Sequence, residues 1–212
     1  MLKQVPVKIT GSVFNGLHNI VNQYFAAQLV VGSIAAINYA QKLPAFAIGI
    51  VTIALTNVLL PHFSVQVINN KQKAFENLFR LLKLVFFIGF LISLFGIITS
   101  EFFIAMFFER KEFTSEDTKL VATLQRILFI YLPFKVSGEI LVSFLTSINK
   151  NIYMTIVSFI SIVLNIILNF LLIDGFGILG IVIATTTVII VRNTILFLFT
   201  RKQKLIHKKL SA

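Results

Sequence analysis

Long apolar runs separated by short polar links make up almost the whole chain. A helix needs about 20 mostly apolar residues to cross the hydrocarbon core of a bilayer. Runs of that length or longer predict six transmembrane helices, at residues 6–28, 33–64, 75–98, 118–148, 152–173 and 178–200. The pattern indicates an all-α, polytopic membrane protein: a six-transmembrane-helix bundle over residues 1–200, followed by a basic cytoplasmic tail at residues 201–212.

The polar links mark the expected helix ends. Short turns are expected at residues 29–32, 69–73, 149–151 and 174–177, and a longer mixed-charge loop at residues 100–119. Near the end of that loop, Thr114 followed by Glu116 and Asp117 is typical of a helix start. A hydroxyl there caps free amides, and carboxylates favour the positive end of the helix.

The composition supports a lipid environment. Of the 212 residues 57% are hydrophobic and 13% charged, whereas soluble domains have about 45–50% apolar and about 25% charged residues. So few charges cannot cover a water-facing surface, and the surplus apolar surface must face lipid. The sequence has no cysteine, which excludes disulfides and thiolate metal sites.

The net charge of +11 does not indicate nucleic-acid binding, because the basic residues lie between apolar runs rather than on one face. Cytoplasmic loops of membrane proteins are enriched in Lys and Arg. On one side of six crossings lie twelve such residues: Lys3, Lys8, Lys71, Lys73, Arg80, Lys83, Lys150, Arg201, Lys202, Lys204, Lys208 and Lys209. The other side has three, Arg110, Lys111 and Lys119, so both termini are predicted to be cytoplasmic.

Polar side chains gather inside three of the expected helices, at helical spacing in the first and the fifth. They are Asn15, His18, Asn19 and Asn22 in the first, Ser158, Ser161, Asn165 and Asn169 in the fifth, and Thr185, Thr186 and Thr187 in the sixth. Residues three and four apart share one face of a helix. The stripes are therefore expected to meet, either as interhelical hydrogen bonds that support packing or around a cavity or ion site.

Charged residues at membrane depth are the second candidate set. Lys42 either extends to the interface or faces a cavity, and Lys135 and Glu139 are spaced to pair along one helix face. This intramembrane ion pair is either structural or involved in proton or ion coupling. Arg192 is interpreted as close enough to the cytoplasmic end to reach the interface. We find no acid–base pair, nucleophile motif or metal motif, so an enzyme is not expected.

Five segments resemble the MurJ/MviN family, in family order and spacing. Residues 32–43 (GSIAAINYAQKL) are similar to the family pattern GSxxxLxYAxRL. Residues 49–54 (GIVTIA) and 59–64 (LLPHFS) resemble PxGxxxxALxTxLLPxLS. Residues 107–114 (FFERKEFT) resemble LFxxGxFT, and residues 180–185 (GIVIAT) resemble GxxLAT. Together these motifs are specific, and they are distributed over nearly the whole chain.

The resemblance implies a lipid II flippase of the bacterial inner membrane, in the same superfamily as MATE exporters. Such proteins have two six-helix lobes around a central cavity and carry a lipid-linked peptidoglycan precursor, whose headgroup is linked to undecaprenyl diphosphate. This chain resembles the second lobe, helices seven to twelve, so a first lobe is an expected partner chain alongside membrane lipids. Lys42 stands where the family has a cavity arginine, which implies a substrate-binding role.

The family resemblance also implies a cation site, with Na⁺ as the coupling ion and no other cofactor. The matching positions are Asn22, Asn165, Asn169, the carbonyl of Ile181, and Thr185. Asn22 and Asn169 stand where the family can have aspartates, so this site has lost two negative charges.

Other functions remain open beside the flippase. The chain could be a lobe of an O-antigen-type flippase or of a MATE-like exporter, which the YAxRL-like and FxxxFT-like stretches disfavour. It could also be a non-transporting or degenerate membrane scaffold, which the lost acids and the absent first lobe favour.

Overall fold

The structure is a computed structural model that describes residues 5–110 and 112–210, with the side chains of residues 5–15, 54–57 and 208–210 outside the description. Within these residues the chain forms six helices. They are α1 (Val5–Ala27), α2 (Ser33–Asn69), α3 (Lys71–Phe108), α4 (Ser115–Ser147), α5 (Asn151–Phe176) and α6 (Ile178–Leu210).

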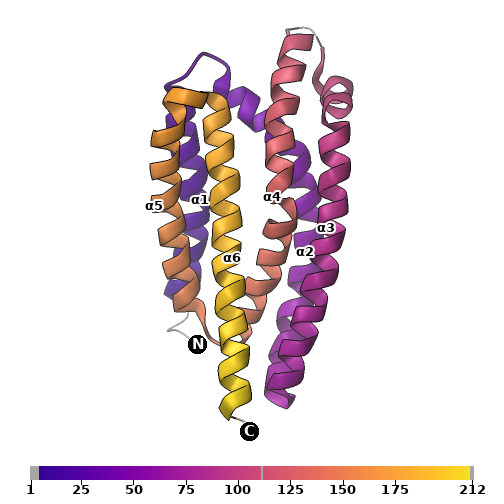
Figure 1. Cartoon of the computed structure of the whole chain (residues 1–212), viewed down its shortest axis with the longest axis vertical. Helices are drawn as coiled ribbons and strands as arrows, with labels where there is room; N and C mark the ends of the chain where they lie inside the picture. The colour runs from indigo at the N-terminus through magenta and orange to yellow at the C-terminus, as the bar shows by residue number, and fades with distance from the viewer. Residues whose placement is uncertain (1–4, 111, 211–212) are drawn as a thin grey trace.

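The helices run up and down along one long axis (Figure 1). α1, α5 and α6 pack together in one half of the bundle, and α3 packs on α4 in the other. α2 begins beside α1 and ends beside α3, behind the other helices in Figure 1. α4 contacts α2, α3 and α6 and joins the two halves. α1 begins and α6 ends at the same end of the bundle, as an even number of crossings requires (Figure 1).

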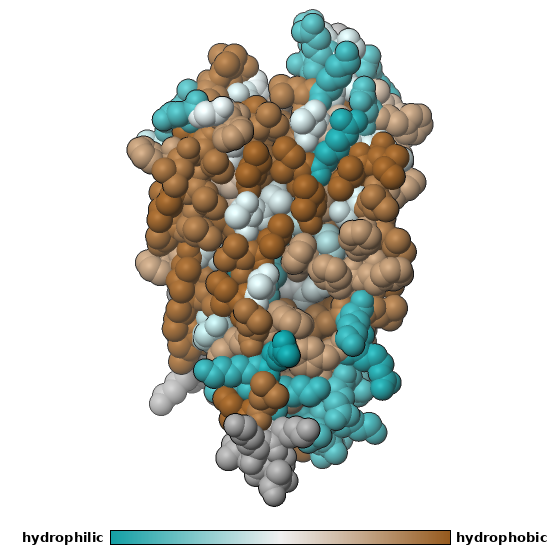
Figure 2. All heavy atoms as spheres, in the orientation of Figure 1, coloured by the Kyte–Doolittle hydropathy of each residue, from teal (hydrophilic) through white to brown (hydrophobic). Residues whose placement is uncertain are grey.

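The expected all-α membrane architecture is confirmed. Five of the described helical segments are long and apolar enough to cross a membrane, one each in α2, α3, α4, α5 and α6. In α1 side chains are described only from Gly16 onward, so that crossing stays a prediction. In α3, residues 84–100 carry no charge, a length of about 26 Å that matches a hydrocarbon core. Figure 2 shows the corresponding apolar band between two hydrophilic ends.

The expected loop at residues 100–119 is much shorter than predicted. α3 continues to Phe108, because Ser100 donates to the carbonyl oxygen of Gly96 at 2.7 Å and Glu101 pairs with Arg126 of α4 at 3.0 Å. The polar residues that suggested a loop therefore have partners within or between helices. The start of α4 was predicted correctly: Thr114 and Asp117 form a reciprocal capping box.

The end of the bundle where α1 begins and α6 ends is also more helical than predicted. Between α2 and α3 only Asn70 is non-helical, and its side chain accepts a hydrogen bond from the Lys73 amide at 2.9 Å. α6 passes Thr200 and ends at Leu210, so most of the basic tail belongs to a helix. This extension packs on the start of α3, where the His207 ring lies 6.3 Å from that of Phe75.

Prolines and turns follow the expected positions with small shifts. Pro44 and Pro61 lie inside α2, and Pro133 inside α4, without ending either helix. The turn predicted at residues 174–177 reduces to Gly177, because its φ of +53° is a conformation that glycine adopts without a steric cost. α5 and α6 therefore run antiparallel as close neighbours, which brings their polar stripes together.

Candidate functional site

A chain of hydrogen bonds links the polar stripes of α1, α5 and α6. The Asn169 amide nitrogen donates to Oδ1 of Asn22 at 3.1 Å, and the Asn22 amide nitrogen donates to Oγ1 of Thr185 at 2.9 Å. Thr185 in turn donates to the carbonyl oxygen of Ile181 at 2.8 Å. Four of the five residues of the expected cation site thus form one connected chain across three helices.

The fifth residue, Asn165, is fully buried one helical turn from Asn169, beside the His18 ring. Among the described residues, no hydrogen bond of good geometry satisfies either of its amide atoms. Oδ1 of Asn169 is likewise buried without a partner. Neutral buried acceptors of this kind are suited to an ordered water molecule. Of the rest of the α1 stripe, Asn19 is exposed, and the side chain of Asn15 lies outside the description.

This arrangement does not fit a sodium ion. The described site contains no carboxylate, and the amide N–H groups of Asn22 and Asn169 are used as links between helices. The charges that reach its His18 side are Arg192 and Lys135, both cationic. A buried cation would therefore lack a compensating charge, which is costly in a low-dielectric environment.

A cluster of three charged side chains joins α4 and α6. Nζ of Lys135 is 2.8 Å from Oε1 of Glu139, and each side chain is 26% exposed. Glu139 also interacts electrostatically with Arg192. Arg192 is partly buried in α6, nine residues before Arg201, and its neighbour Asn193 lines a groove together with Lys83. Our interpretation of Arg192 as an interface residue stays a prediction. The cluster has two cations for one acid.

A small amide-lined cavity of about 80 Å³ opens between α1 and α2. Its polar walls are Asn19, Asn22, Gln23, Asn38 and Gln41. Next to it in sequence, Lys42 is exposed on α2. Our sequence reasoning missed Asn38 and Gln41. Gln41 follows Asn38 by three residues and Lys42 follows it by four, so the spacing could have placed all three on one helix face.

Comparison with known proteins places this chain in a transporter family. The family model described as "Lipid II flippase MurJ" matches residues 1–212. The chain belongs to the MurJ family. Members of this family are lipid flippases rather than enzymes, in agreement with the sequence analysis.

Two curated MurJ relatives are similar over much of this chain. A probable lipid II flippase MurJ of Treponema pallidum is 24% identical over 187 residues, which cover 88% of this chain and 36% of the relative. A probable lipid II flippase MurJ of Buchnera aphidicola is 30% identical over 148 residues, 69% of this chain and 28% of the relative. The chain thus spans about a third of the length of these relatives.

Solved structures confirm the fold. A lipid II flippase MurJ in an inward closed conformation superposes with a TM-score of 0.80 at 22% identity, covering 95% of this chain and 44% of that one. An outward-facing multidrug resistance MATE family transporter of the MOP superfamily gives 0.79 at 19% identity, covering 95% and 45%. This chain therefore has the fold of slightly less than half of each of these proteins.

Proposed function

We propose that this chain is one six-helix lobe of a lipid II flippase. In this proposal it moves the lipid-linked peptidoglycan precursor across the bacterial inner membrane, together with a first six-helix lobe. Both chain termini are placed in the cytoplasm, on the basis of the excess of Lys and Arg at that end. The match to the MurJ family over residues 1–212 supports the substrate class.

The observation that carries this proposal is the polar face of α1 and α2. Exposed Lys42 and the amides of the small α1–α2 cavity lie on a bundle whose other surfaces are largely apolar. At membrane depth such groups are costly unless they face protein or a water-filled cavity. A second lobe opposite α1 and α2 would enclose that cavity.

The mechanism that follows is alternating access. The two lobes rock about the cavity, so that the polar face is exposed to each side of the membrane in turn. Lys42 attracts the diphosphate by charge, and the neighbouring amides of Asn38 and Gln41 can donate to headgroup oxygens. The polyprenyl tail stays in lipid. No covalent step is needed.

A second candidate function is a non-transporting scaffold. It is favoured by the neutral amide chain at Asn22 and Asn169, which provides packing without an ion. Complementation distinguishes the two functions. We expect this chain to rescue a strain depleted of its lipid II flippase when a first lobe is co-expressed. Absence of rescue, with both chains present in the membrane, would support the scaffold instead.

Within the same rescue assay, Lys42→Ala is expected to lower lipid II translocation about tenfold, the value of one charge-assisted hydrogen bond. Membrane levels should not change, because the side chain is exposed. Lys42→Arg should retain activity, and Lys119→Ala, an exposed lysine on α4, is the matched control. Full activity of Lys42→Ala would remove the diphosphate role.

The amide chain predicts that folding of this protein does not depend on sodium. The apparent melting temperature in detergent should be equal in NaCl and KCl, since no carboxylate attracts the ion among the described residues of the site. The double variant Asn22→Asp/Asn169→Asp supplies two negative charges and should be more stable in NaCl than in KCl. A sodium-dependent rise in the parent chain would show that the neutral amides do hold the ion.

A further inference from the structure

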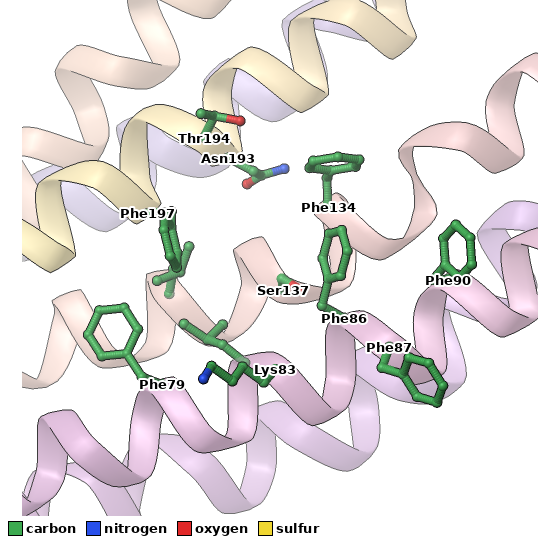
Figure 3. A pocket seen from close by; sticks show the side chains of 12 residues that line it. Phe79, Lys83, Phe86, Phe87, Phe90, Phe134, Ser137, Asn193, Thr194 and Phe197 are labelled. Carbon is green, nitrogen blue, oxygen red and sulfur yellow. The ribbon is translucent and has the colours of Figure 1, made fainter.

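An aromatic groove opens between α3, α4 and α6 (Figure 3), whereas the amide cavity is lined by α1 and α2. Its volume is about 720 Å³, within the usual range for sites that bind small molecules. Six phenylalanines dominate its walls: Phe79, Phe86, Phe87, Phe90, Phe134 and Phe197. A hydrocarbon chain fits such a groove, but any apolar surface in a bilayer contacts hydrocarbon, so further features are needed to indicate a specific site.

The first such feature is a pair of lysines at one end of the groove. Lys83 lines the groove and extends toward Phe79 (Figure 3). Nζ of Lys204 lies 5.1 Å from the centroid of the same Phe79 ring. Lys83 directly precedes the uncharged residues 84–100 of α3, so the two lysines lie at the headgroup level on the termini side. Basic pockets between transmembrane helices at this level bind anionic headgroups.

The second feature is polar. The Ser137 hydroxyl and Oδ1 of Asn193 belong to residues of the groove wall and have no hydrogen-bond partner among the described residues. Asn193 is only 4% exposed, and its amide nitrogen already donates to the carbonyl oxygen of Ile189 at 2.9 Å. A bare hydrocarbon chain cannot pair with either atom. Both atoms are buried in the groove wall. The Ser137 hydroxyl can donate to an ester carbonyl of a bound lipid after rotation of its side chain, whereas Oδ1 of Asn193 packs against Gly138 rather than toward the groove.

From these features we propose that the groove binds an anionic glycerophospholipid of the leaflet on the termini side. Its phosphate lies between Lys83 and Lys204, its ester region faces Ser137, and one acyl chain lies along the phenylalanines. The site is separate from the proposed lipid II face, since Lys42 and the amide cavity belong to α1 and α2. The proposed function therefore does not depend on whether this groove binds the lipid.

The chain has no tryptophan, so one introduced tryptophan reports without background. We would place Phe134→Trp in the groove and Phe170→Trp on the exposed surface of α5 as the matched reporter. Each variant is reconstituted in phosphatidylcholine vesicles containing increasing fractions of dibrominated phosphatidylglycerol or dibrominated phosphatidylcholine. Bromine quenches a neighbouring tryptophan. If Phe134→Trp does not fold, Phe90→Trp, half-exposed in the same groove, replaces it.

The groove reporter should reach half-maximal quenching at a fraction of phosphatidylglycerol about 25-fold below that of phosphatidylcholine, since each of the two lysines favours an anionic lipid by about fivefold. The α5 reporter should show no preference. Lys83→Gln/Lys204→Gln should abolish the preference, whereas Lys73→Gln/Lys202→Gln, with the same loss of charge at exposed positions, should retain it. Equal quenching by the two lipids at the groove, or a preference that survives loss of Lys83 and Lys204, would overturn the proposal.

Discussion

Gly180→Leu is expected to cost about 1–3 kcal/mol of stability, the usual effect of overpacking a close helix contact. A Cβ atom at Gly180 would lie 2.5 Å from the carbonyl oxygen of Leu172 and 2.8 Å from its carbonyl carbon. Both are backbone atoms, so the clash cannot be relieved by a rotamer change. α6 must instead move away from α5.

The displacement should also disturb the hydrogen-bonded amide chain, because Thr185 lies little more than one turn beyond Gly180. Thermal unfolding in detergent measures the loss, and lipid II translocation with a first lobe measures the effect on function. Gly175→Leu is the matched control: it lies at the end of α5, its Cβ would meet nothing within 4 Å, and its stability should change little. Equal melting temperatures for the two variants would contradict the close contact.

Glu139→Gln is expected to lower stability by about 1–3 kcal/mol, less than the roughly 3–5 kcal/mol that breaking a fully buried ion pair costs. The acid lies 2.8 Å from Lys135 and interacts with Arg192, and its removal leaves two partly buried cations without it. The cost is reduced because the side chains of the pair are 26% exposed and therefore partly screened. Thermal unfolding in detergent measures the difference from the parent chain.

The second ion pair of the bundle is a matched control. Glu101 and Arg126 are 3.0 Å apart, but their side chains are 50% and 40% exposed at the far end of the bundle. Glu101→Gln should therefore change the melting temperature much less. The double variant Lys135→Met/Glu139→Leu should be more stable than Glu139→Gln, because it removes a cation together with the acid. A Glu139→Gln protein as stable as the parent would show that the pair is not structural.

The helices could be predicted from the sequence because each depends on local properties. Apolar runs of sufficient length located five crossings that the structure supports, and Thr114 located the start of α4 by its capping chemistry. The loop at residues 100–119 was overpredicted because the partner of Glu101 is Arg126 of another helix. An ion pair across helices makes charged residues compatible with a helix, and a single-chain pattern does not reveal it.

In the candidate site, too, local patterns could be predicted from the sequence and contacts between helices could not. Spacing within one helix placed Asn165 and Asn169 on a common face, and placed Lys135 next to Glu139. The identity of the facing groups depends on how helices pack: Asn169 meets Asn22, and Arg192 approaches Glu139. The aromatic groove could not be predicted at all, because exposed phenylalanines of α3 resemble any lipid-facing surface in sequence.

Cysteine accessibility of Asn38 tests the central claim most directly, that α1 and α2 border a water-filled cavity open to each side in turn. The chain has no native cysteine, and Asn38 is exposed beside Lys42. With a first lobe co-expressed, Asn38→Cys is treated with an impermeant maleimide in spheroplasts and in inside-out vesicles. Ile160→Cys on the apolar surface of α5 should react in neither, and Lys202→Cys only in inside-out vesicles. We predict that Asn38→Cys reacts from both sides; reaction from one side only, or from neither, would contradict alternating access.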